Sequence, residues 1–250
     1  MGKNFWKIIN DLISESDLII EVLDARLVEA TRNKEIEDKI QRAGKKLLYV
    51  ITKCDLVKKE TLEQEKKRLK PCVFVSAKEH YGTMILLQKI MELAKGKQVI
   101  VAVVGYPNVG KSSVINALKG KKSAGVSSKA GFTKAKQKVS INEVITLMDT
   151  PGVFSYQEDD EQGLALIGSK DAHQLKDPEG VAYAILDLFI KNERKQALED
   201  YYTLSLEHDS PEDILEELAL KKKKLRKGNT PDTETMARIV ISDWQRGYLQ

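Results

Sequence analysis

Short apolar runs, most of them rich in β-branched side chains, recur through the first two thirds of the chain. Such runs are typical of buried parallel strands, which are covered on both faces. They occupy residues 18–23, 47–51, 73–75, 99–104, 139–141 and 144–148. Helical patterns at residues 33–43, 83–94 and 113–118 lie between several of these runs, and each ends close to a glycine, a common helix stop. This alternation predicts an α/β fold with a doubly wound, mostly parallel sheet.

The strand pattern ceases after about residue 168, and helical patterns follow. Three segments combine a capping side chain, a proline and an acidic residue, which is favourable at a helix start: residues 177–179, 210–212 and 230–232. We expect Gly228 to end the helix before the third start. The sequence therefore predicts two domains, an α/β domain over residues 1–168 and a small all-α domain over residues 169–250.

The distribution of charge adds a candidate binding surface. The 250-residue chain is 31% charged with a net charge of +4, but seven lysines and no acidic residue lie between Lys119 and Lys138. A second basic run, KKKKLRK, occupies residues 221–227. Two local basic patches in an otherwise balanced chain suggest a polyanionic partner.

Other bulk features suggest where the protein works. No apolar run approaches the ~18 residues that span a bilayer, and the first residues lack the apolar core of a signal peptide. Cys54 and Cys72 have no CxxC partner, so we expect reduced thiols. These features predict a cytoplasmic protein that does not bind membranes, and we expect a monomer.

A phosphate-binding pattern stands near the middle of the chain. Residues 105–112, GYPNVGKS, fit GxxxxGK[ST], and a predicted strand enters the segment while a predicted helix leaves it. Backbone N–H groups of such a loop surround the β-phosphate, and the helix N-terminus favours its charge. We expect Lys111 to reach the β- and γ-phosphates and the Ser112 hydroxyl to bind Mg²⁺. The predicted nucleotide contacts of this segment are Asn108, Val109, Gly110, Lys111, Ser112 and Ser113.

Two later segments supply the remaining metal and γ-phosphate contacts. Asp149 ends a predicted strand and can hold Mg²⁺ through water, while the Gly152 N–H can meet the γ-phosphate and detect its loss. Thr133 lies in the loop between these elements and can complete Mg²⁺ coordination in the GTP state. Lys111 and Thr133 are therefore the candidate catalytic residues, and no general base is assigned.

Base specificity is predicted from residues 52–55, TKCD, which follow a predicted strand. The Asp55 carboxylate can accept hydrogen bonds from both N1–H and N2–H₂ of guanine, a donor pair that adenine lacks. The stem of Lys53 can pack on the ring. Thr52 takes a position that is commonly asparagine in GTPases and can make fewer hydrogen bonds than an amide. The segment therefore predicts a guanine site in which Asp55 sets base choice.

A companion segment and the order of all the motifs complete this prediction. Ser76, Ala77 and Lys78 follow the next strand, and we expect the Ala77 N–H to meet guanine O6. In a Ras-like GTPase the guanine-binding segments follow the phosphate loop, whereas here they precede it. The order predicts a circularly permuted Ras-like P-loop GTPase domain.

Together these motifs resemble the YlqF/YawG family of circularly permuted GTPases. The resemblance extends to residues 24–26 (DAR), 31–33 (TRN), 164–169 (LALIGS) and 243–249 (DWQRGYL), and so covers nearly the whole chain. It implies a protein that cycles between GTP and GDP in assembly of the large ribosomal subunit, with that subunit or its rRNA as partner.

Several residues imply slow intrinsic hydrolysis. Val153 takes the place of the water-orienting glutamine of Ras-like enzymes, and valine cannot orient water by hydrogen bonding. Bacterial members of the subgroup carry an N-terminal histidine implicated in hydrolysis, but His80, His173 and His208 lie elsewhere in this sequence. In similar GTPases an asparagine at the position of Asn108 can ligate K⁺, which supplies positive charge to the transition state. Activation by K⁺ is therefore a hypothesis.

The permuted order has a mechanical consequence, and two alternative functions stay open. Because the helical domain follows the γ-phosphate-sensing segment, we expect GTP to change its pose or mobility and to raise RNA affinity in a salt-dependent way. The protein could instead act on another RNA, such as tRNA, or on a membrane through a basic helix at residues 221–227. The other alternative is a GTP-binding scaffold with negligible hydrolysis.

Overall fold

A computed structural model describes residues 3–120, 138–148, 161–168, 170–191 and 193–249. The chain divides into two compact units, Met1–Tyr156 and Gln157–Gln250. Sequence analysis put a domain boundary at residue 168, whereas α7 (Glu161–Leu166) groups with the second unit. The reason is local packing, because the Trp244 indole N–H donates to the Leu166 carbonyl at 2.7 Å.

The first unit is built on a six-stranded sheet with the strand order β3-β2-β1-β4-β6-β5. Neighbouring strands are parallel except β5, which runs antiparallel to β6, so the prediction of a parallel strand at residues 139–141 is wrong. The strands are β1 (Leu18–Asp24), β2 (Lys46–Thr52), β3 (Cys72–Val75), β4 (Val99–Val104), β5 (Lys138–Ser140) and β6 (Ile145–Met148).

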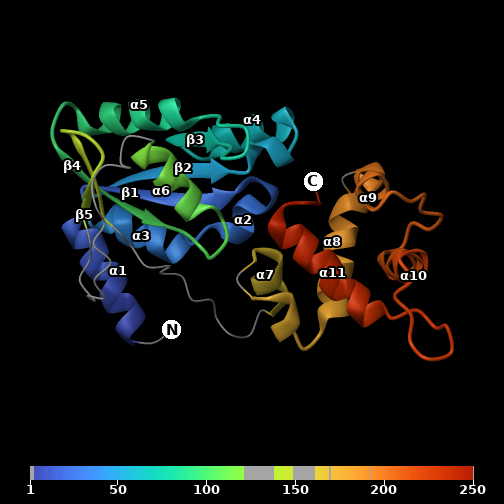
Figure 1. Ribbon diagram of the computed structural model, residues 1–250. Coiled ribbons are helices and arrows are strands. Elements are labelled where there is room, and N and C mark those ends of the chain that lie inside the picture. The colour runs from blue at the N-terminus through green and yellow to red at the C-terminus, as the bar shows by residue number, and fades with distance from the viewer. Residues whose placement is uncertain (1–2, 121–137, 149–160, 169, 192, 250) are drawn as a thin grey trace. The chain divides into compact units, whose positions relative to one another are not determined.

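Helices cover both sides of this sheet, with α5 on one side and α1 and α3 on the other (Figure 1). The helices of this unit are α1 (Lys3–Glu15), α2 (Val28–Thr31), α3 (Lys34–Arg42), α4 (Lys59–Arg68), α5 (Thr83–Ala94) and α6 (Lys111–Lys119), with 3₁₀ turns at Ala25–Leu27 and Cys54–Leu56. Every residue of β1 is buried, as expected for a central strand covered on two faces.

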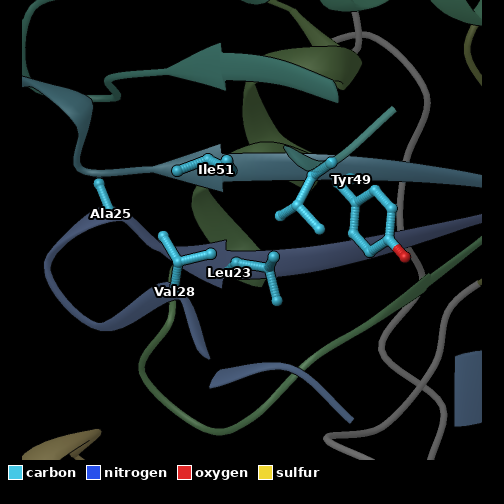
Figure 2. Close-up of a cluster of buried hydrophobic side chains, with 6 residues drawn as sticks. Leu23, Ala25, Val28, Tyr49 and Ile51 are labelled. Atoms are coloured by element: carbon cyan, nitrogen blue, oxygen red, sulfur yellow. The ribbon is translucent and has the colours of Figure 1, made fainter. Parts of the chain in front are cut away.

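A hydrophobic cluster joins the ends of β1 and β2 to the segment after β1. Leu23, Tyr49 and Ile51 share one face of the sheet with Ala25 and Val28 (Figure 2). Burying a large apolar side chain stabilises a fold by about 1.5–3 kcal/mol. The cluster therefore fixes the end of β2, which precedes the predicted guanine-binding segment, together with the end of β1, which precedes the DAR segment.

The second unit is helical, and two of its predicted helix starts are confirmed. It contains α7, α8 (Pro178–Lys191), α9 (Lys195–Tyr202), α10 (Pro211–Lys221) and α11 (Thr233–Arg246), with a 3₁₀ turn at Ala172–Gln174. Asp177 Oδ1 accepts from the Gly180 N–H at 2.9 Å, and Ser210 Oγ accepts from the Asp213 N–H at 3.1 Å. Side-chain caps of this kind satisfy N–H groups that have no partner within the helix.

The start of the third predicted helix and the end of the helix before it differ from the prediction. Asp232, not Thr230, caps α11 by accepting from the Thr235 N–H at 3.2 Å. Helix α10 ends at Lys221 rather than near Gly228, because Lys223 takes a left-handed backbone with φ of +55°. Of the basic run, only Lys221 is helical, so the basic helix of the membrane alternative does not form.

The helices in the part of the chain that the structure describes are short or polar. None of the helices found there combines the length and the apolar character needed to span a bilayer.

Candidate functional site

Four polar segments meet at one edge of the sheet. Strands β1, β2, β3 and β4 are parallel, and register pairs Asp24 with Thr52 and Thr52 with Val75, the last residues of their strands. Strand β4 lies beside β1, with Val104 opposite Glu21. Ligands of open α/β sheets bind outside such carboxyl ends. This edge is therefore the expected position of a ligand site.

Residues 105–110 form the turn between β4 and α6, and its shape favours glycine at two positions. Gly105 has φ of +148°, and a Cβ added there would lie 2.6 Å from the carbonyl oxygen of Val22. Gly110 has φ of +100°, and its added Cβ would lie 3.2 Å from Thr52 Oγ1. The loop thus approaches β1 too closely for a side chain at position 105, and at position 110 the positive φ and the tight contact with Thr52 both disfavour one.

The first turn of α6 carries the candidate phosphate and metal contacts. Lys111 is half-buried and its ammonium donates to the Tyr106 carbonyl within the loop. Burial lowers the pKa of Lys111 to about 8, because the charged amine loses hydration. Ser112 and Ser113 are exposed, and Asn108 is exposed with φ of +59°. The free turn therefore holds a desolvated cation that anionic oxygens would stabilise.

Thr52 connects the segment predicted to bind guanine, residues 52–55, to the loop predicted to bind phosphate. Its buried hydroxyl lies 2.9 Å from the Leu23 carbonyl and also contacts the Val109 carbonyl. A hydroxyl has one proton, so it donates to one of the two carbonyls at a time. Thr52 therefore acts through the backbone of β1 and of the loop, a role that sequence analysis did not assign to it.

Lys53 is held by an ion pair that sequence analysis did not predict. Its ammonium lies 2.7 Å from Asp24 Oδ2, and the Arg26 guanidinium contacts the same carboxylate through Nε at 3.1 Å and Nη2 at 2.9 Å. Burial alone would raise the pKa of Asp24, but Arg26 and then Lys53 lower it below its usual value. Burial lowers the pKa of Lys53, and Asp24 opposes that shift. Asp24 thus fixes the lysine stem that is predicted to pack on a base.

Two of the candidate base-reading residues, Asp55 and Ser76, border one pocket, whereas Lys53, Ala77 and Lys78 are not among its lining residues. Asp55 from the turn after β2 and Ser76 from the end of β3 both line a pocket of about 450 Å³, together with Phe74 and Tyr81. Ser76 and Tyr81 exchange two backbone hydrogen bonds of 3.0 Å. The bonds close a short loop that carries Ala77 and Lys78, both exposed. Pockets of this size commonly bind small ligands.

A second polar contact reaches the loop from the α3 side. The Asn33 amide donates to the Tyr106 hydroxyl at 3.3 Å, and the Asn33 N–H donates to Glu21 Oε1 at 2.8 Å. Burial is the main reason that the pKa of Glu21 is raised to about 8, and the nearby Glu37 carboxylate adds to the shift. In the sequence, the only signal for a role of Glu21 is its position three residues before the DAR segment.

The structure brings Thr52 of the first early motif into contact with the loop at residues 105–110, but it does not test every predicted contact. Thr133, Asp149, Gly152 and Val153 lie outside the described residues. Within the described ranges no group of three or more His, Cys, Asp or Glu side chains could hold a metal. The exposed Ser112 hydroxyl nevertheless fits Mg²⁺, which in nucleotide sites is held mainly by phosphate oxygens, water and a hydroxyl.

Comparison with protein families gives two matches to GTPases. The family model described as RsgA GTPase matches residues 21–158, and the model described as 50S ribosome-binding GTPase matches residues 100–218.

Individual relatives and a solved structure are also similar. An uncharacterized GTP-binding protein of Methanocaldococcus jannaschii is 42% identical over 97% of this chain and 65% of its own length. Nucleolar GTP-binding protein 2 of Kluyveromyces lactis is 33% identical over 99% of this chain and 50% of its own length. The chain thus spans about half to two thirds of the curated relatives it matches. GNP-bound YlqF from T. maritima is similar in fold, with a TM-score of 0.66, 23% identity and coverage of 98% of this chain and 94% of that one.

Proposed function

We propose that this chain, which belongs to the circularly permuted GTPases of the YlqF/YawG family, hydrolyses GTP as a switch in assembly of the large ribosomal subunit. The main support for nucleotide binding is that the segment at residues 52–55 contacts the loop at residues 105–110. Thr52 contacts the Val109 carbonyl, while Asp55 and Ser76 border one pocket. These contacts support a site in which the proposed guanine-binding segments and the proposed phosphate loop lie together at the carboxyl ends of parallel strands.

The roles proposed for the phosphate end follow from the chemistry of the loop. Lys111 pairs with the β- and γ-phosphates, and the backbone N–H groups from Asn108 to Ser113 surround the β-phosphate. Mg²⁺ would neutralise developing phosphate charge, held by Ser112 and Thr133 directly and by Asp149 through water. Gly152 is proposed to contact the γ-phosphate.

The roles proposed for the base end rest on the fixed positions of two segments. Asp55 accepts from guanine N1–H and N2–H₂, the Lys53 stem packs on the ring, and the Ala77 N–H donates to O6. Thr52 contributes by holding the Val109 carbonyl. Competition between GTP and ATP tests this assignment, since Asp55→Ala should remove the preference for guanine.

The ribosomal part of the proposal draws on the names of the similar proteins and on charge. A matched family model is described as a 50S ribosome-binding GTPase, and several relatives are named as nucleolar GTP-binding proteins. Co-sedimentation with purified large ribosomal subunits in the presence of a non-hydrolysable GTP analogue tests it. Absence of the protein from the subunit fraction at low salt would contradict the proposal.

Val153 favours a second candidate, a GTP-binding scaffold with negligible hydrolysis. Single-turnover hydrolysis with and without large subunits separates the two, because a switch should hydrolyse faster on its partner.

The same assay in KCl and in NaCl tests whether Asn108 binds an activating K⁺, and equal rates would end that proposal.

A further inference from the structure

A pocket of about 420 Å³ is formed entirely by residues of the helical unit. We propose that it binds an unpaired nucleotide of single-stranded RNA, with the base on an aromatic surface and the phosphates on a lysine-rich turn. The proposal deepens the ribosomal function above, because it names the RNA chemistry that this unit would recognise. The residues that carry it are Tyr201, Tyr202, Lys222, Lys224, Asp243 and, beside the pocket, Tyr248.

The aromatic part consists of two exposed, stacked rings. Tyr201 is 39% exposed and Tyr248 is 52% exposed. Their ring centres lie 6.3 Å apart at an interplanar angle of 27°, and Tyr202 holds the Tyr201 ring edge-on at 4.9 Å and 73°. Unpaired bases bind to such rings by stacking, which every base can do. The exposed pair thus offers a platform that a duplex, whose bases are already stacked, cannot use.

The basic part lies on the turn after α10. Lys222 donates to the Tyr202 carbonyl at 2.5 Å and lies 5.6 Å from the centre of that ring, which fixes it at the pocket. Lys221 is paired with Glu217, whereas Lys223 and Lys224 have no ion pair with any residue that the structure describes. Ammonium groups without a carboxylate partner are available to phosphates, whose contacts provide most of the affinity for nucleic acids.

Asp243 distinguishes a nucleotide from other polyanions. Its carboxylate accepts from the Tyr202 hydroxyl at 3.2 Å, is also hydrogen-bonded to the Tyr201 side chain, and lines the pocket. A carboxylate accepts hydrogen bonds from the amino groups of bases. It would repel an acidic peptide or a free phosphate that entered the same space. The combination of stacking rings, outer lysines and an inner acceptor therefore favours RNA over an acidic protein segment.

The test measures fluorescence anisotropy of a labelled single-stranded RNA oligonucleotide and of its duplex, using the full chain saturated with GDP. We expect the single strand to bind more tightly than the duplex at equal salt. Tyr201→Ala and Tyr248→Ala should each weaken single-strand binding by about tenfold or more, while Tyr201→Phe, which keeps the ring, should not. Lys224→Ala should reduce the slope of log Kd against log salt concentration by about 0.7.

Leu225→Ala is the matched control. Leu225 is 41% exposed on the same basic turn but does not line the pocket, so its loss should change binding by less than about twofold. Thermal unfolding of each variant shows that the helical unit is folded. Equal affinity for single strand and duplex, no effect of either tyrosine variant, or displacement of RNA by an acidic peptide would overturn the proposal.

Co-sedimentation of the same variants with large ribosomal subunits separates this inference from the proposed function. If the native chain binds single-stranded RNA through its tyrosines but not the subunit, the pocket is supported and the ribosomal role is contradicted. If the native chain binds the subunit and the tyrosine variants bind RNA normally, the ribosomal role stands and the pocket inference is wrong.

Discussion

At the scale of single residues, Asp24 shows how a buried charge can position a binding side chain. It is 2% exposed and holds two cations, Arg26 and Lys53. Removing one charge from such a group costs more than a surface ion pair contributes, because the remaining charges stay buried without compensation. The DAR segment is thereby part of the candidate base site, although Asp24 itself has no predicted contact with the nucleotide.

Asp24→Asn should lower both stability and guanine-nucleotide affinity. The amide keeps the size of the side chain but leaves the ammonium of Lys53 beside the Arg26 guanidinium without a counter-charge. We expect a loss of about 3–5 kcal/mol in the free energy of unfolding, measured by urea titration, and a higher Kd for fluorescent GDP. Glu92→Gln is the control, since Glu92 is 66% exposed in its ion pair with Lys89 and its loss should cost no more than about 1 kcal/mol.

Lys111 predicts a pH dependence of nucleotide binding. Its pKa is about 8 in the free protein, and phosphate oxygens should raise that value because they favour the charged amine. Binding above about pH 8 must then take up a proton. Affinity for GDP should be constant near neutral pH and fall by up to about tenfold per pH unit above pH 8. Calorimetry in buffers of different ionisation enthalpy measures the uptake; binding without uptake at that pH would contradict this role.

At the scale of elements, the turn between β4 and α6 is defined by close backbone approach. Gly105→Ala should displace the loop, since its Cβ would lie 2.6 Å from the Val22 carbonyl. We expect the free energy of unfolding to fall by about 1–3 kcal/mol. We also expect loss of measurable nucleotide binding. Gly44→Ala is the control: Gly44 also has positive φ, +65°, but open space around it. It should cost about 1–2 kcal/mol and leave Kd unchanged; loss of binding there too would contradict the steric explanation.

Much of the secondary structure could be predicted from the sequence, because buried strands and capped helices carry local signals. Helix α4 was not predicted, and none of its residues is buried, so no apolar stripe marks it. Helix α1 was also missed although Ile9, Leu12 and Ile13 are buried at helical spacing, a signal that was present. The antiparallel direction of β5 depends on pairing with β6 and has no local signature.

The candidate site was only partly predictable for a related reason. Asp55 and Lys111 lie in short motifs with known chemistry, so the sequence alone predicts roles for them. The contact of Thr52 with Val109 joins residues 57 positions apart, and that of Lys53 with Asp24 joins residues 29 positions apart. Contacts of this kind follow from strand order and register, which place Thr52 beside Asp24 at one edge. Local periodicity does not contain that information.

At the scale of the whole molecule, the permuted order separates two tasks along the chain. The predicted base and phosphate-loop contacts lie between residues 52 and 113, and the second unit begins at Gln157, five positions after Gly152. Each unit also holds one of the two tryptophans, Trp6 in α1 and Trp244 in α11. Tryptophan fluorescence can therefore report on each unit separately.

This arrangement predicts that nucleotide stabilises the helical unit as well as the unit that binds it. In a Trp6→Phe variant, Trp244 is the only tryptophan, 4% exposed and packed edge-on against Phe189 at 6.1 Å. A ligand at a hundred times its Kd stabilises the state that binds it by about 2.7 kcal/mol. If the γ-phosphate contact proposed for Gly152 is coupled to the second unit through the chain that joins them, part of this stabilisation reaches α11. The midpoint of thermal unfolding reported by Trp244 should then rise more with a non-hydrolysable GTP analogue than with GDP, whereas a midpoint unchanged by either nucleotide would mean that the two units unfold independently.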